Sequence, residues 1–170
     1  MTVADNIAEW LYEKGITTAF GIVGGGNTAI FEAIAKLGKT RIVCVHHEQA
    51  AVMAAGSYYR ISGRLSVAIV TTGAGSTNTV TGLASAWMDR VPVLILSGNE
   101  SSKYLDANTR VLGVQGYRSA EFARPFTKAA AQVDADNWRV ILDGFVDEIL
   151  DAPYGPAWCD VPKNVQNAVV

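Results

Sequence analysis

Short apolar runs alternate along the chain with segments in which apolar residues recur every three or four positions. The runs predict buried strands of a parallel sheet, at residues 19–23, 40–45, 66–72, 91–97, 128–133 and 157–161. The segments between them have the spacing of amphipathic helices. This alternation predicts an α/β fold, a doubly wound, mostly parallel six-stranded sheet with helices on both faces.

Capping residues predict where several helices begin. Thr2 and Asp5 have the spacing of a capping box, and Gly15 is expected to end that first helix. Two later helices have candidate caps at alternative positions: Asn27 or Thr28, and Asp134 or Asp136. Residues 98–119 fit no such pattern, since they are polar and lack a clear period. Connections of this length are often functional.

The composition indicates a folded chain with a partly covered surface. Of 170 residues, 49% are hydrophobic and only 18% are charged, and the mean hydropathy is +0.18. A typical globular protein has roughly 25% charged residues. The deficit favours a surface covered by another chain, although a domain rich in Ala and Gly would also be less charged than average.

Charge and cysteine content exclude several classes of protein. The net charge is −2, so no basic field attracts nucleic acid or an anionic membrane. No apolar run reaches the roughly 18 residues needed to span a bilayer, and the N-terminus does not resemble a signal peptide. Cys44 and Cys159 each lie in an apolar run, so we expect both to be buried thiols in a reducing, cytoplasmic compartment. Neither has a second metal ligand at short spacing, so no metal site is expected in this chain.

Three turns between a strand and a helix have unusual chemistry: residues 24–27, 46–49 and 71–78. In a parallel sheet all three lie at the carboxyl edge, where ligands bind. The glycine runs are either anion-binding loops or simply tight turns. The run from Gly73 to Asn78 lacks the third glycine of a dinucleotide fingerprint, which argues against a Rossmann-type dehydrogenase, and no P-loop lysine is present.

Glu48 is the most informative residue of these turns. It is either a common first-turn acid that the helix dipole favours, or a partly desolvated carboxyl suited to sharing a proton. The apolar residues that follow it favour the second interpretation. His46 and His47 precede it, and each is more often a packing or hydrogen-bonding histidine than a catalyst.

The segment from His47 to Asn99 closely resembles the N-terminal, pyrimidine-binding domain of thiamine-diphosphate enzymes, in the group of acetolactate synthase, pyruvate oxidase and 2-oxo acid decarboxylases. The resemblance rests on HEQAAVMAAG, TTGAGSTN and AWMDRVPVL at these spacings, and it extends from GIVGGGNTAIFEAI to GPAWCDVPKNVQ. It therefore implies that residues 1–170 form one pyrimidine-binding domain.

The resemblance implies a role for each matching residue. Glu48 matches the catalytic glutamate that hydrogen-bonds N1′ of the cofactor's aminopyrimidine ring and so promotes proton removal from thiazolium C2. Gln115 resembles a glutamine that reaches the reacting centre in synthase-like members. The positions implied at the cofactor are Gly24, Gly25, Glu48, Thr72, Gly73 and Asn78. Val23 and Ala74 replace frequent prolines, and residues 100–117, where substrate choice is expected, diverge most.

The family's second domain, which binds the diphosphate through Mg²⁺, has no counterpart here, since the chain contains no Gly-Asp-Gly motif. The resemblance therefore implies a half-site, inactive alone, that a diphosphate-binding domain or subunit completes and that supplies the Mg²⁺. We expect a homodimer of this domain within a larger oligomer. The initial Met1 and the lack of a terminal linker favour a separate subunit over a domain cut from a longer enzyme.

Acetolactate-synthase-like carboligation of 2-keto acids is the expected activity. The alternatives are a subunit of a split 2-keto acid decarboxylase, of the sulfopyruvate or phosphonopyruvate type, and a non-catalytic binding module of the same fold. The presence of Glu48 weighs against the last, since a degenerate copy need not retain it.

Overall fold

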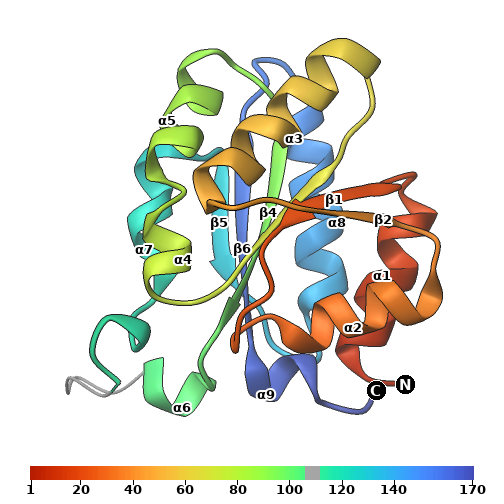
Figure 1. Ribbon diagram of the computed structural model, residues 1–170, viewed down its shortest axis with the longest axis vertical. Coiled ribbons are helices and arrows are strands. Elements are labelled where there is room, and N and C mark those ends of the chain that lie inside the picture. Colours follow the sequence, from red (N-terminus) through yellow and green to blue (C-terminus); the bar gives the residue numbers. More distant parts are fainter. Residues whose placement is uncertain (106–111) are drawn as a thin grey trace.

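A six-stranded sheet, parallel throughout, forms the centre of the molecule (Figure 1). The computed structural model describes residues 1–105 and 112–170. The strand order is β2-β1-β3-β4-β6-β5. The strands are β1 (Thr18–Gly21), β2 (Arg41–Cys44), β3 (Val67–Val70), β4 (Val93–Asn99), β5 (Ala129–Gln132) and β6 (Pro156–Pro162). The predicted α/β class, strand number and doubly wound arrangement are confirmed.

Helices cover both faces of the sheet. One face carries α1 (Val3–Glu13), α2 (Thr28–Leu37), α8 (Trp138–Leu150) and α9 (Lys163–Gln166). The other carries α3 (Glu48–Ser62), α5 (Val80–Met88) and α7 (Ser119–Ala123). The shorter elements are α4 (Ala74–Thr77), α6 (Ser102–Leu105), η1 (Gly113–Gln115) and η2 (Arg124–Phe126). Within the described ranges, no helix combines the length and apolar character needed to cross a bilayer.

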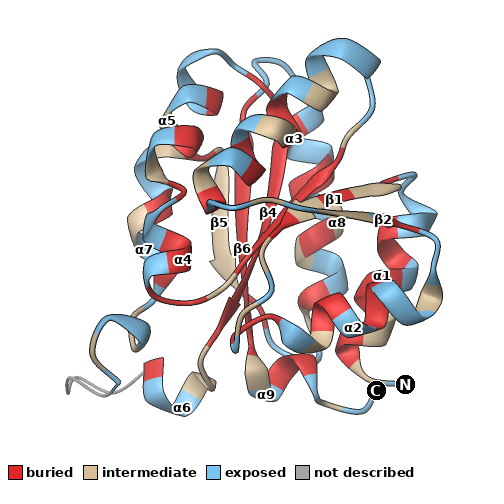
Figure 2. Ribbon diagram, viewed as in Figure 1, coloured by how far each residue is buried: buried red, intermediate tan, exposed pale blue. Residues whose placement is uncertain are grey.

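Alternate side chains of the central strands belong to two separate cores. Val67 and Ile69 of β3 pack with α1, α2 and α8, whereas Ala68 and Val70 pack with α3 and α5. Every residue of β3, β4 and β6 is buried (Figure 2). Strands covered on both faces favour apolar residues on both sides, which explains their nearly continuous apolar runs.

The edge strands depart from the prediction. β2 is a partly exposed edge strand rather than a buried one, because only β1 pairs with it. Cys44 at its end is exposed, so the expectation of a buried thiol there is wrong. Cys159 lies in the interior strand β6 and is buried as expected, and burial raises the pKa of its thiol.

The first helix begins with the predicted capping box. Thr2 Oγ1 accepts a hydrogen bond from the Asp5 backbone N–H at 3.1 Å, and Asp5 Oδ2 accepts one from the Thr2 N–H at 3.0 Å. The other two caps differ from expectation. Asn27 and Asn137 occupy the N-cap positions of α2 and α8, but neither side chain caps its helix. Asn137 Oδ1 instead accepts from the Asp134 N–H.

Replacing Asp5 with Asn is expected to cost about 0.3–1 kcal/mol of unfolding free energy at neutral pH, the typical value of a negative charge in the first turn of a helix. Hydrogen bonds from Thr2 hold the pKa of Asp5 below its ordinary value of 3.8. The stability that the carboxylate contributes is therefore complete above that value and is lost as the pH falls below it. Urea unfolding of both proteins across the acid range checks this: the difference should vanish in strong acid, and a constant difference would contradict it.

Candidate functional site

Thr71 joins two of the glycine-containing turns at the carboxyl edge of the sheet. It follows β3, and its Oγ1 accepts a hydrogen bond from the Gly26 N–H at 3.0 Å. A Cβ atom on Gly24 would lie 2.7 Å from Thr71 Cγ2, and one on Gly75 would lie 2.6 Å from the same atom. Real Cβ atoms do not approach this closely, so glycine at both positions allows the turns to meet on Thr71. The predicted convergence of these two turns is confirmed.

Asn27 shapes the first turn from within. Its Oδ1 accepts from the Gly24 N–H at 2.8 Å, and its Nδ2 donates to the Ile22 carbonyl at 3.0 Å. The fully buried amide thus holds the backbone of the turn in place. Gly25 at its tip remains exposed, and the nearest atom to a Cβ there would be Lys163 Nζ at 4.0 Å.

Glu48 begins α3 and is 9% exposed. Its Oε2 accepts a hydrogen bond from Asn78 Nδ2 at 2.9 Å, and its Oε1 lies 3.3 Å from where a Cβ on Gly75 would be. Among the described residues Oε1 accepts no hydrogen bond, so one carboxylate oxygen is fixed and the other is available to a ligand. His47 caps the helix, since its Nδ1 accepts from the Gln49 N–H at 3.3 Å.

Thr72, Gly73 and Gln115 form a second group next to this turn. Gly73 has φ +69°, and a Cβ on it would lie 2.9 Å from Gln115 Cγ. Thr72 Oγ1 lies 2.9 Å from both the Gln115 carbonyl oxygen and Asn99 Oδ1. The hydroxyl of Thr72 therefore lies between Asn99 of β4 and the backbone of Gln115, and Gly73 packs against the same segment.

Several residues around this group were not singled out from the sequence. The Tyr117 hydroxyl donates to the Gly73 carbonyl at 3.1 Å, and burial raises the pKa of this tyrosine to about 12. Asn99 Nδ2 donates to Ser119 Oγ at 3.2 Å, and Ser119 Oγ donates to Asp160. The sequence contained one signal for Asn99 and Asp160, because each is a polar residue in a largely apolar strand segment.

An ion pair lies beside the exposed tip of the first turn. Lys163 Nζ is 2.9 Å and 3.0 Å from the two carboxylate oxygens of Glu100. Each residue directly follows a strand, Glu100 after β4 and Lys163 after β6. The ammonium closest to Gly25 is therefore already neutralised.

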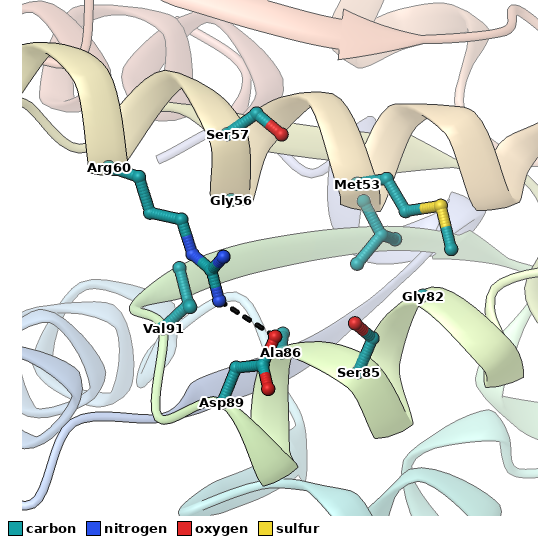
Figure 3. A pocket seen from close by; sticks show the side chains of 10 residues that line it. Met53, Gly56, Ser57, Arg60, Gly82, Ser85, Ala86, Asp89 and Val91 are labelled. Atoms are coloured by element: carbon teal, nitrogen blue, oxygen red, sulfur yellow. Dashed lines mark hydrogen bonds and ion pairs between the residues drawn. The ribbon is translucent and has the colours of Figure 1, made fainter.

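A groove of about 210 Å³ between α3 and α5 is separate from this site (Figure 3). Met53 and Arg60 line it from α3, and Gly82 and Asp89 line the opposite side. Arg60 Nη2 spans it to Asp89 Oδ2 at 2.7 Å. None of the predicted site residues lines the groove. The groove is therefore distinct from the candidate site at the carboxyl edge of the sheet.

The site lacks the ligands for a divalent cation in the part of the chain that the structure describes. There, no three His, Cys, Asp or Glu side chains are grouped so that they could hold a metal ion. The site instead offers a nearly buried carboxylate, an amide and closely packed glycine turns. These groups suit a flat, polar heterocycle better than a phosphate or a metal.

Comparison with known proteins identifies the class to which this architecture belongs. Residues 1–132 match the model of the thiamine pyrophosphate enzyme N-terminal TPP-binding domain. The chain belongs to this family, and the resemblance noted from its motifs is confirmed.

Relatives that it matches include acetolactate synthases. It is 35% identical over 173 residues to the acetolactate synthase large subunit of Corynebacterium glutamicum, covering 99% of this chain and 26% of that protein. It is 34% identical to the chloroplastic acetolactate synthase of Arabidopsis thaliana, covering 96% and 24%. It is 32% identical to the isozyme 3 large subunit of Escherichia coli, covering 96% and 28%. The chain thus spans about a quarter of the length of these relatives.

Proposed function

We propose that this chain is the pyrimidine-binding half of a thiamine-diphosphate-dependent enzyme that acts on 2-keto acids. The observation that carries the proposal is the carboxylate of Glu48. It is nearly buried at the carboxyl edge, with Oε2 held by Asn78 and Oε1 available beside Gly75. A carboxylate placed in this way accepts a hydrogen bond from a nitrogen heterocycle and shares its proton.

The residues at this edge fit the aminopyrimidine end of the cofactor. Glu48 would hold the ring nitrogen, and Gly24, Gly25, Thr72 and Gly73 would provide backbone close to the ring. Asn78 would keep the carboxylate in place rather than contact the ring itself, because its amide is already bonded to Glu48. When bound, thiamine diphosphate supplies the electron sink for cleaving the bond beside the keto group.

The same edge does not fit the diphosphate end. The net charge is −2, and the lysine nearest Gly25 is paired with Glu100. The described residues also offer no metal-binding cluster. We therefore propose that a diphosphate-binding domain or subunit supplies these contacts and the Mg²⁺. The coverage of about a quarter of each relative supports such a partner. A homodimer of this domain within the larger assembly is part of the proposal.

The resemblance of Gln115 to a glutamine of synthase-like members supports carboligation over simple decarboxylation. Gln115 packs on Gly73 next to the proposed ring site, where a side-chain amide can contact a second substrate. An acetolactate-synthase-like reaction is therefore the preferred activity, and a split 2-keto acid decarboxylase is the second candidate. An assay of CO₂ release and of coupled product over a panel of 2-keto acids, with the partner present, separates the two.

Calorimetric titration of thiamine diphosphate and Mg²⁺ into the chain alone tests the half-site. We expect no tight, Mg²⁺-dependent binding, because the residues described at this edge include no group that would hold the diphosphate. Addition of the diphosphate-binding partner is expected to restore Mg²⁺-dependent binding. Tight binding by the chain alone would contradict the requirement for a partner, and no binding with the partner would contradict the assignment to this cofactor.

A further inference from the structure

Asp160 is a fully buried carboxylate on an interior strand of the sheet, and the proposed reaction does not use it. It lies in β6 between strands β4 and β5 and has no exposed surface. Its Oδ2 accepts from the Ala120 N–H at 2.8 Å, and its Oδ1 accepts from Trp158 Nε1 at 3.0 Å and from Ser119 Oγ. Burial raises the pKa of the carboxyl, and these hydrogen bonds oppose that rise.

The groups that donate hydrogen bonds to Asp160 indicate its structural role. A strand buried on both faces needs only apolar side chains, and a buried charge is costly unless several donors meet it. Two of its three donors come from Ser119 and Ala120, at the start of α7 and outside the sheet. The carboxylate therefore attaches the end of the segment that precedes α7 to the interior strand β6.

That segment carries the residues that cover the Thr72–Gly73 turn. From Ser119 the hydrogen bonds continue to Asn99 Nδ2 at 3.2 Å, and Asn99 Oδ1 lies 2.9 Å from Thr72 Oγ1. Thr72 Oγ1 in turn reaches the Gln115 carbonyl oxygen at 2.9 Å. A continuous chain of buried polar groups thus links Asp160 to the backbone of Gln115.

Tyr117 also connects this segment to Gly73 and to Asn99 of β4. Its hydroxyl donates to the Gly73 carbonyl, and its carbonyl accepts from Asn99 Nδ2 at 3.2 Å. Its ring packs against Phe122 of α7, which contacts Trp158 next to Asp160 in β6. Tyr117 is therefore connected to Asp160 both by hydrogen bonds, through Asn99 and Ser119, and by aromatic contacts, through Phe122 and Trp158. Arg118 of the same segment has a separate contact, since its Nε donates to the Leu105 carbonyl at 3.3 Å.

We propose that Asp160 is a positioning residue that holds residues 112–119, and with them Gln115, over the Thr72–Gly73 turn. The importance of Gln115 rests on the proposed function, but the anchoring itself does not. Asp160 touches no ligand, and it acts through Ser119, Ala120 and Asn99.

Hydrogen–deuterium exchange of the ligand-free protein tests the anchoring. Asp160→Asn is expected to raise the exchange rates of the amides of residues 113–120 by about tenfold or more, the effect of losing a hydrogen bond to a charged group. Amides of β1 and β3 should exchange within about twofold of the original rates. Unchanged rates in residues 113–120, or an equal rise in β1 and β3, would overturn the proposal.

Asp143→Asn is the matched control. Asp143 also accepts a hydrogen bond from an indole, Trp10 Nε1 at 2.9 Å, but it lies on α8 beside Lys14. This variant should leave residues 113–120 unchanged, and a similar loosening there would overturn the specific role of Asp160. If Asp160→Asn does not fold, Ser119→Ala tests the same anchoring, because it removes one hydrogen bond to Asp160 and keeps the carboxylate. Faster exchange of residues 113–120 in this variant supports the anchoring, and unchanged exchange overturns it.

A second measurement on the completed enzyme separates positioning from general stability. Asp160→Asn is expected to lower kcat about tenfold while the Kd for thiamine diphosphate changes less than twofold, because the contacts of Glu48 are intact. Equal losses in both quantities would overturn the positioning role. Absence of turnover in the unaltered complex would count against the proposed function alone, since the exchange result needs no cofactor.

Discussion

Glu48→Gln is expected to reduce kcat of the completed enzyme by at least about 100-fold, within the range for loss of a group that takes part in proton transfer. The amide has the shape of the carboxylate, and its oxygen can still accept from Asn78. It cannot accept a proton as a carboxylate does. Steady-state turnover of the variant, measured with saturating thiamine diphosphate and Mg²⁺, checks this result.

The fold should survive this substitution. The side chain sits at the end of a helix rather than in either apolar core, so we expect a melting temperature close to that of the original protein. Glu9→Gln provides the control, since Glu9 is exposed on α1, far along the chain from the turns, and should keep full activity. Full turnover in Glu48→Gln would remove the role assigned to this carboxylate.

Gly98→Ala is expected to destabilise the protein by about 3 kcal/mol or more, at the upper end of the cost of overpacking a buried site. A Cβ at this position would lie 2.1 Å from the Gly26 carbonyl oxygen and 2.7 Å from Asn27 Cα. The backbone cannot retreat easily, because Gln166 Nε2 also holds the Gly26 carbonyl, at 2.7 Å. Urea unfolding at equilibrium measures the loss.

Gly144→Ala is the opposite case and the matched control. Gly144 lies within α8, and a Cβ there would meet no atom within 4 Å. The substitution should stabilise the protein by about 0.5–1 kcal/mol, because alanine loses less conformational freedom than glycine in a helix. A Gly98→Ala variant as stable as the original would show that the first turn and β4 do not pack as closely as the structure indicates.

The order of strands and helices could be predicted from the sequence because interior parallel strands are apolar at most positions. The continuous runs at β3, β4 and β6 are a direct consequence of burial on both faces. The run at β2 looks the same in sequence, yet it forms a partly exposed edge with Cys44 in solvent. Strand composition does not specify which strands lie at an edge, since that depends on which neighbours pair.

The candidate site, like the fold, could be predicted only in part from the sequence. Local sequence placed Glu48 at the start of a helix and the glycines in turns, because chain geometry near a strand end depends on a few adjacent residues. The contacts among Glu48, Asn78, Gly75 and Thr71 depend on turns that are distant in sequence. The sequence by itself determined the fold class, the family and the chemistry available at one edge of the sheet. Only the tertiary structure decided that a carboxylate in β6 fastens the segment bearing Gln115, because long-range hydrogen bonds leave no periodic signal in the chain.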